Sequence, residues 1–238
     1  MRVDENLDPI GLLGTAFCPA VGVLLTCAHV ADGPPGTVAI HDTLTDEIAL
    51  IENVRLDPDQ RGLDLALIDS PLERDLEPLI VVPSEVVRPG TETWTYGYFS
   101  TNPTKYEIQA GYFGGRVTTV QTGAETSHGS PDIVLQYPVV EGMSGAPLIV
   151  QSGESEGQTR LGGVTGVCYA SRAQRVVAQE VTDVVQGSDT RSETLWRVVE
   201  FGLAHHINPV AEFLARVGAD DLRADVEELK RRAGDGYV

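Results

Sequence analysis

The 238-residue sequence is poor in basic residues and has no long apolar run. Its 17 Lys and Arg stand against 35 Asp and Glu, for a net charge of −18, and such acidity opposes binding to nucleic-acid phosphates or anionic lipid headgroups. No apolar stretch approaches the roughly 18 to 20 residues that a membrane-spanning helix needs, and the N-terminal segment lacks the apolar core of a signal peptide. We therefore expect a soluble, cytoplasmic protein with no nucleic-acid partner and no membrane partner.

Cysteine is also scarce. Cys18, Cys27 and Cys168 are an odd number without paired spacing, which argues against a disulfide framework and suits a reducing compartment. We interpret them as small buried apolar side chains. No CxxC or HExxH spacing occurs, so the sequence predicts no metal site, and no motif requires a cofactor.

Short apolar or alternating segments recur between Gly, Pro and Asp residues, a spacing typical of antiparallel all-β sandwiches and barrels. The predicted strands are 22–26, 37–40, 65–68, 79–82, 93–98, 133–137, 146–150 and 163–169. Three polar segments resemble surface insertions or hairpins, at 122–130, 151–158 and 186–193.

The C-terminal region has a helical pattern instead. Asn208 and Pro209 are a predicted N-cap and first-turn proline, and apolar residues then follow at i, i+3, i+4 and i+7 up to Gly218. A second helix is predicted to begin at Asp220 or Asp221. We expect both helices to pack against the strands.

Three short segments carry residues suited to acyl transfer. Residues 24–30 (LLTCAHV) lead an apolar strand into His29, residues 62–68 (GLDLALI) place Asp64 before a buried strand, and residues 141–148 (EGMSGAPL) hold Ser144 in a glycine-flanked turn. A serine hydroxyl needs a base to take its proton and a carboxylate to fix the tautomer of that base. His29, Asp64 and Ser144 supply this triad, and the N–H groups of Gly142 and Ser144 are the predicted oxyanion hole.

The order His, Asp, Ser along the chain is that of chymotrypsin and not that of α/β-hydrolases. The three segments resemble those of the trypsin-like peptidase superfamily, in which TAAH, DIAL and GDSGG or GNSGG carry the triad. Residues 86–99, 132–148 and 201–209 are more similar to the bacterial high-temperature-requirement (HtrA) type than to digestive enzymes.

This resemblance, from about residue 11 to about residue 216, implies an all-β, chymotrypsin-like fold of two six-stranded antiparallel β-barrels with a C-terminal α-helix. The first barrel would occupy residues 1–88 and carry His29 and Asp64. The second would occupy residues 89–208 and carry Ser144, and residues 209–238 would form the helical segment. Substrate would bind in the cleft between the barrels.

Two departures from the family pattern bear on control. Met143 stands where members that are activated by N-terminal cleavage have an Asp, so we expect no such zymogen step. Val30 follows His29 where secreted members have a cysteine, which again favours an intracellular enzyme.

Substrate selection is predicted from the same resemblance. It places the substrate pocket at Pro138, Gly166, Val167 and Cys168, none of which is acidic. We therefore expect a small or medium apolar residue before the scissile bond. Residues 171–200 have no counterpart that we can align, and this segment could reshape the pocket.

Two functions of different classes stay open at this point. One is a serine endopeptidase that acts on protein or peptide substrates and is controlled by an activating partner protein. The other is a non-catalytic interaction module of the same fold in a larger signalling or defence assembly. The same triad would also support an esterase-like activity on small acyl compounds. The remaining histidines match no motif and are interpreted as surface or packing residues: His41, His128, His205 and His206.

Overall fold

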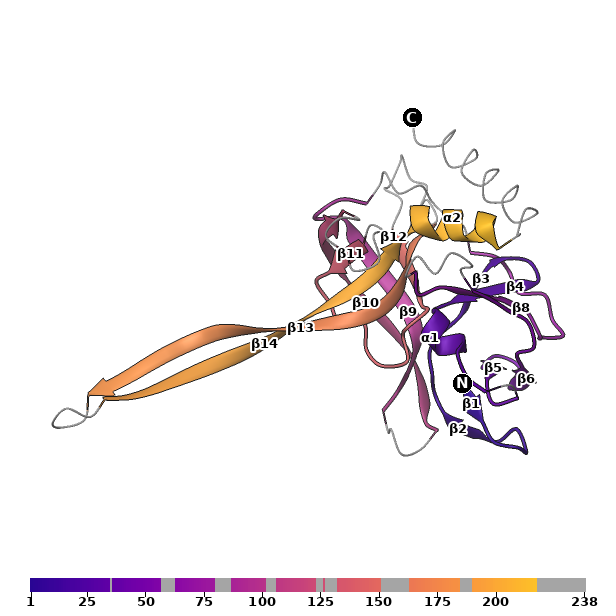
Figure 1. Ribbon diagram of the computed structural model, residues 1–238, viewed down its shortest axis with the longest axis horizontal. Helices are drawn as coiled ribbons and strands as arrows, with labels where there is room; N and C mark the ends of the chain where they lie inside the picture. The colour runs from indigo at the N-terminus through magenta and orange to yellow at the C-terminus, as the bar shows by residue number, and fades with distance from the viewer. Residues whose placement is uncertain are drawn as a thin grey trace, which may run out of the picture.

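The computed structural model describes residues 1–34, 36–56, 63–79, 87–101, 106–122, 126, 132–150, 163–184 and 190–217. Within these ranges the chain is mostly β-structure, arranged as one closed barrel, one open four-stranded sheet and two two-stranded sheets (Figure 1). The all-β prediction with a C-terminal helix is confirmed. The prediction of a second closed barrel is not, because the N-terminal sheets stay open in the described part of the chain.

The closed barrel lies in the C-terminal half. Its strand order is β10-β11-β14-β13-β12-β9, and every neighbouring pair is antiparallel. Side chains from its strands and from the turn around Met143 fill the interior, with Ile133, Leu135 and Leu148 fully buried. The strands are β9 (Glu92–Ser100), β10 (Ile108–Gln121), β11 (Asp132–Leu135), β12 (Pro147–Val150), β13 (Gly163–Val184) and β14 (Thr190–His206).

The open sheet lies in the N-terminal half and has the order β3-β4-β8-β7. Its strands are β3 (Phe17–Ala20), β4 (Val23–Thr26), β7 (Val54–Leu56) and β8 (Ala66–Asp69). Beside it lie two hairpins, β1 (Arg2–Val3) with β2 (Pro9–Gly11) and β5 (Ala39–Asp42) with β6 (Glu47–Leu50). Closure requires tilted strands whose pairing continues around a full circle. In the described part of the chain β3 and β7 each pair with one strand only, so they are the edges of this sheet.

The two central strands of this sheet are apolar on both faces, as expected for strands that are covered on each side. Leu25 and Leu67 pack in one core cluster together with Phe213 from the C-terminal helix, whereas Leu24 and Ile68 pack in a second cluster on the opposite face. β4 and β8 therefore form a buried base, with His29 just after β4 and Asp64 just before β8.

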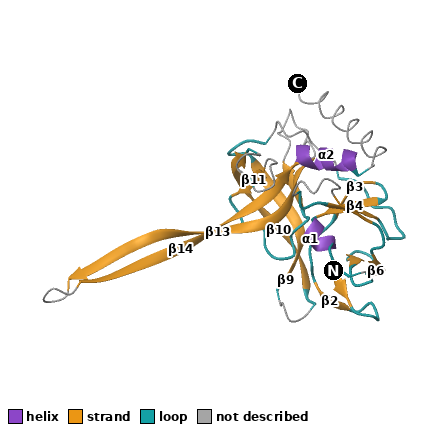
Figure 2. Cartoon of the chain, in the orientation of Figure 1, coloured by secondary structure: helices purple, strands orange, loops and turns teal. Residues whose placement is uncertain are grey.

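β13 and β14 extend beyond the barrel as a long two-stranded arm (Figures 1 and 2). Their pairing runs without a break in the sheet from Gly166↔His206 to Val184↔Thr190, with two register shifts on the way. The arm contains residues 171–184 and 190–200 of the segment without a family counterpart. The predicted strand 163–169 was far too short, although valine and threonine recur through residues 176–184 and favour extended backbone.

Helix α2 (Ile207–Arg216) follows β14 directly. Its N-cap is His206, whose ring Nδ1 accepts a hydrogen bond of 3.4 Å from the Asn208 N–H, so the predicted Asn208 cap lies two residues too far along. Val210, Phe213 and Leu214 are buried against the open sheet, as the helical spacing predicted. Several predicted segments lie outside the described residues. They are the second helix, residues 80–82 of the strand 79–82, most of the segment 122–130, and all of the segment 151–158.

Candidate active site

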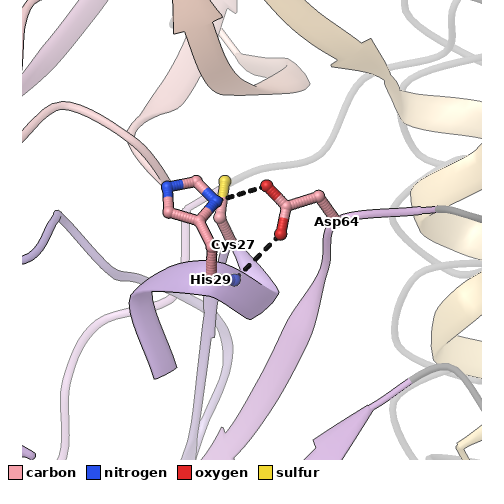
Figure 3. A group of neighbouring side chains, drawn as sticks. All are labelled: Cys27, His29 and Asp64. Carbon is pink, nitrogen blue, oxygen red and sulfur yellow. Dashed lines mark hydrogen bonds and ion pairs between the residues drawn. The ribbon is translucent and has the colours of Figure 1, made fainter. Parts of the chain in front are cut away.

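His29 and Asp64 are brought together at one end of the open sheet. β4 leads directly into α1 (Ala28–Ala31), a single helical turn that carries His29 and that the sequence pattern did not predict. Asp64 lies just before β8, which pairs with β4. The ring Nδ1 of His29 is hydrogen-bonded to Asp64 Oδ2, and the backbone N–H of His29 donates to Asp64 Oδ1 at 2.9 Å (Figure 3). One carboxylate thus orients both the ring and the backbone of the histidine.

This pairing changes the proton affinity of both groups. The hydrogen bond and the negative charge of Asp64 raise the pKa of His29, although partial burial of the ring opposes them. Burial acts to raise the pKa of Asp64, but the hydrogen bonds from His29 outweigh it and bring that pKa below its usual value. The His29 side chain is 49% exposed and its Nε2 points away from Asp64 (Figure 3). The ring can therefore exchange a proton with a group on its solvent side.

Ser144 lies in a tight turn before β12. Gly142 and Gly145 on either side have positive φ values of 94° and 88°, which glycine adopts without strain. A Cβ atom at Gly145 would lie 2.1 Å from the Thr15 carbonyl oxygen and 2.2 Å from Thr26 Oγ1. The turn is also joined to the N-terminal half by the Thr15 N–H, which donates to the Ser144 carbonyl at 2.8 Å.

The hydroxyl of Ser144 donates a hydrogen bond of 3.1 Å to the backbone carbonyl of Tyr169. No hydrogen bond joins Ser144 to His29 in the described part of the chain. Among the same residues, the N–H groups of Gly142 and Ser144 take part in no hydrogen bond. The turn therefore presents the predicted donors, while the hydroxyl faces a carbonyl and not the histidine.

The residues predicted to line a substrate pocket lie mostly beneath this turn. Val167 and Cys168 are fully buried, and Gly166 is buried between β12 and β14. The Gly145 N–H donates to the Cys168 carbonyl at 2.7 Å, and the Cys168 N–H donates to the Ala146 carbonyl at 2.9 Å. These contacts support the serine turn from below, whereas Pro138 is partly exposed. The assignment of a substrate pocket to these four residues stays a prediction.

One residue that holds the segment before the serine turn was missed, the exposed Ser171. Ser171 Oγ accepts from the Val139 N–H at 2.7 Å and donates to the Val139 carbonyl at 2.9 Å, which joins the segment before the serine turn to β13. Tyr169, on the strand to which the resemblance assigns the pocket, is partly exposed, and its carbonyl accepts the hydrogen bond from Ser144. Ser171 matched no motif, and only its hydrogen bonds to Val139 reveal its position.

The histidines outside the motifs have structural partners. His205 is fully buried and stacks on Tyr169, with ring centroids 4.1 Å apart, while the Tyr169 hydroxyl donates to Asp132 at 2.6 Å. His206 caps α2, and His41 is hydrogen-bonded to Tyr106 and Asp46. For these three the packing interpretation holds, whereas His128 lies outside the described residues.

A family model for the trypsin-like peptidase domain matches residues 14–157, more than half of the sequence. The chain belongs to the trypsin-like peptidase family. The match contains His29, Asp64 and Ser144 and ends before the β13–β14 arm. A search of curated proteins found no match. Family membership supports a peptidase of the hydrolase class with protein or peptide substrates.

As for membranes, none of the helices in the described ranges has the length and apolar character to span a bilayer.

Proposed function

We propose that the protein is a serine endopeptidase that hydrolyses peptide bonds through His29, Asp64 and Ser144. The main support is the attachment of Asp64 to His29 at two points, the ring Nδ1 and the backbone N–H. A carboxylate at Nδ1 keeps the hydrogen of a neutral imidazole on that nitrogen and leaves Nε2 as the proton acceptor. A histidine with only a packing role would have no need of this arrangement at a half-exposed position.

The proposed reaction follows from these groups. Nε2 of His29 takes the Ser144 proton as Oγ attacks the scissile carbonyl, and the N–H groups of Gly142 and Ser144 stabilise the oxyanion. His29 then gives the proton to the leaving amine, and water repeats the sequence to release the acyl group. Asp64 remains ionised throughout, and its negative charge stabilises the transient imidazolium.

The hydrogen bond from Ser144 to Tyr169 supports control of this site by a partner or by substrate. The hydroxyl must turn away from the Tyr169 carbonyl before His29 can take its proton, and binding in the cleft is the proposed trigger. Met143 is fully buried where members activated by chain cleavage keep an Asp. Control by a bound partner, a cytoplasmic location and the HtrA-type relationship all belong to this proposal.

A second candidate is a non-catalytic interaction module. The β13–β14 arm favours it, because a two-stranded ribbon that extends from a domain has two open edges that can pair with another chain. The Ser144 hydroxyl bound to Tyr169 is also compatible with an inactive site.

Peptide turnover distinguishes the two candidates. The wild-type protein is incubated with a defined peptide mixture, and the products are identified by mass spectrometry. Ser144→Ala should abolish cleavage, whereas Ser70→Ala is a matched control, because Ser70 follows β8 at the end opposite to Asp64. A p-nitrophenyl ester assayed in parallel ranks esterase activity. No cleavage by folded wild-type protein, alone or with added cell extract, would contradict the proposal.

A further inference from the structure

Cys27 places a third metal-binding side chain beside the His29–Asp64 pair. The Cys27 sulfur, a ring nitrogen of His29 and a carboxylate oxygen of Asp64 all lie within 4.8 Å of one another. Figure 3 shows the sulfur next to the hydrogen bond between His29 and Asp64. Cys27 follows β4, His29 lies in α1, and Asp64 lies two residues before β8. Asp64 is 35 residues from His29, so the sequence spacing does not reveal the group of three.

The donor set is suited to one class of ion. A thiolate, an imidazole and a carboxylate are the ligands of Zn²⁺ in proteins, and three of them leave a fourth position for water. Cys27 is a free thiol, and its sulfur donates to the Cys168 carbonyl at 3.3 Å, a bond that leaves the sulfur lone pairs unused. His29 and Asp64 are 49% and 29% exposed, so an ion can reach these two side chains from solvent, and the fully buried Cys27 sulfur would bind it from the core side.

Small movements would bring these atoms into a coordination sphere. Metal–ligand distances of about 2.0–2.3 Å place the donor atoms of one tetrahedral ion about 3.3–3.8 Å apart. The His29–Asp64 hydrogen bond would have to open, and donor atoms that now lie within 4.8 Å of one another would have to approach by at most about 1 Å. The half-exposed ring of His29 can make both movements by turning toward the buried sulfur.

We propose that Cys27, His29 and Asp64 bind a zinc ion that switches the catalytic site off. On binding, the Cys27 thiol loses its proton to solvent and the sulfur coordinates as thiolate. The metal occupies Nδ1 of His29, so the single hydrogen of the neutral ring moves to Nε2. Nε2 then has no lone pair for the Ser144 proton, and Asp64 no longer orients the ring. The metal site itself is independent of the proposed function, whereas its inhibitory effect rests on it.

Cobalt(II) tests the site without any enzyme assay, because a Co²⁺–thiolate bond gives a charge-transfer band in the near ultraviolet. The wild-type protein should bind one Co²⁺ with this band, and Zn²⁺ should displace it. Cys27→Ala and His29→Gln should both lose the band. Cys18→Ala should keep it, because Cys18 is equally a buried free thiol but lies outside the group.

Two results would overturn the site: no thiolate band in the wild-type protein, or a band that survives Cys27→Ala. His29→Gln decides the matter if Cys27→Ala fails to fold, since His29 is exposed and its replacement leaves the core intact.

The effect on catalysis is read from fluorophosphonate labelling of Ser144. Saturating Zn²⁺ should abolish labelling of the wild-type protein, a chelator should restore it, and in Cys27→Ala the rates with and without Zn²⁺ should be equal. Labelling that Zn²⁺ leaves unchanged refutes the switch but supports the proposed function. A Co²⁺ band in a protein that never labels supports the metal site and counts against the proposed function.

Discussion

The open N-terminal sheet and the closed C-terminal barrel contribute to the site in different ways. The open sheet positions His29 through side-chain hydrogen bonds to Asp64. The barrel positions Ser144 through backbone geometry, with glycines at positive φ and the carbonyls of β13 beneath the turn. The activity of such a site should depend on side-chain chemistry on the sheet side and on backbone conformation on the barrel side. The predictions below test that contrast.

The largest effect is expected for Asp64→Asn. The amide would favour the wrong tautomer of His29, and in serine peptidases this change lowers the turnover rate about 10⁴-fold while the fold persists. The measurement is kcat/KM on the peptide that the wild-type protein cleaves best. Asp69→Asn is the control, because Asp69 lies at the end of β8 away from Asp64 and pairs with Arg55 at the surface. Equal rates for Asp64→Asn and the wild type would exclude His29 as a base oriented by Asp64.

Removal of the aromatic ring of Phe213 should destabilise the open sheet. This fully buried side chain of α2 packs with Leu25 and Leu67, so Phe213→Ala should lower the free energy of unfolding by about 3–5 kcal/mol. Leu44→Ala, at an 80% exposed position, should change it by less than about 0.5 kcal/mol. Urea denaturation measures both. Similar values for the two variants would show that the sheet does not depend on α2 for its core.

Gly145→Ala should break the junction between the two regions. The new methyl group would meet the Thr15 carbonyl and the Thr26 hydroxyl at a positive φ, at a cost of roughly 2–5 kcal/mol. Gly90 has a similar φ of 91° but open space around it, so Gly90→Ala isolates the backbone penalty of about 1–2 kcal/mol. Thermal unfolding of the pair gives the difference. If Gly145→Ala destabilises the protein no more than Gly90→Ala does, Gly145 does not lie in close contact with Thr15 and Thr26.

The smallest effect is a shift in pH dependence. Ser144 reacts when His29 is neutral, so the labelling rate should fall as the pH drops through the pKa of His29. Because the hydrogen bond to Asp64 raises that pKa, the acid limb should lie above the value of about 6.5 for a free histidine. In Asp64→Asn the limb should move to lower pH. An acid limb of the wild-type labelling rate below about pH 6.5, the pKa of a free histidine, would contradict the pairing of His29 with Asp64.

The sequence offered candidate site residues more readily than it offered the architecture around them, and of the proposed triad only the His29–Asp64 pair is joined by hydrogen bonds. A short apolar strand precedes or follows each of His29, Asp64 and Ser144, and the glycines beside Ser144 indicate a turn. Local patterns are therefore enough to propose these three residues as a triad. Closure of a barrel depends on pairing between strands distant in the sequence, and the pattern of single strands carries no such information. The length of the β13–β14 arm was missed for the same reason.

Other features depend on conformations that composition does not specify. The direction of the Ser144 hydroxyl is one rotamer among three, and it is the neighbouring Tyr169 carbonyl that accepts its hydrogen. His206 caps α2 although the pattern favoured Asn208, because β14 runs straight into the helix and places the ring against its first turn. Cys27 is a buried core residue, as the sequence predicted, and its additional place beside His29 and Asp64 follows from the pairing of β4 with β8.

The central claim is that Ser144 is a nucleophile activated by His29. Intact-protein mass spectrometry after exposure to a fluorophosphonate probe tests it most directly. We expect one phosphonate adduct on the metal-free wild-type protein, mapped to Ser144 by peptide analysis and absent from Ser144→Ala. An adduct that persists in folded Ser144→Ala, or a folded, metal-free wild-type protein that remains unlabelled with substrate peptides and cell extract present, would contradict it.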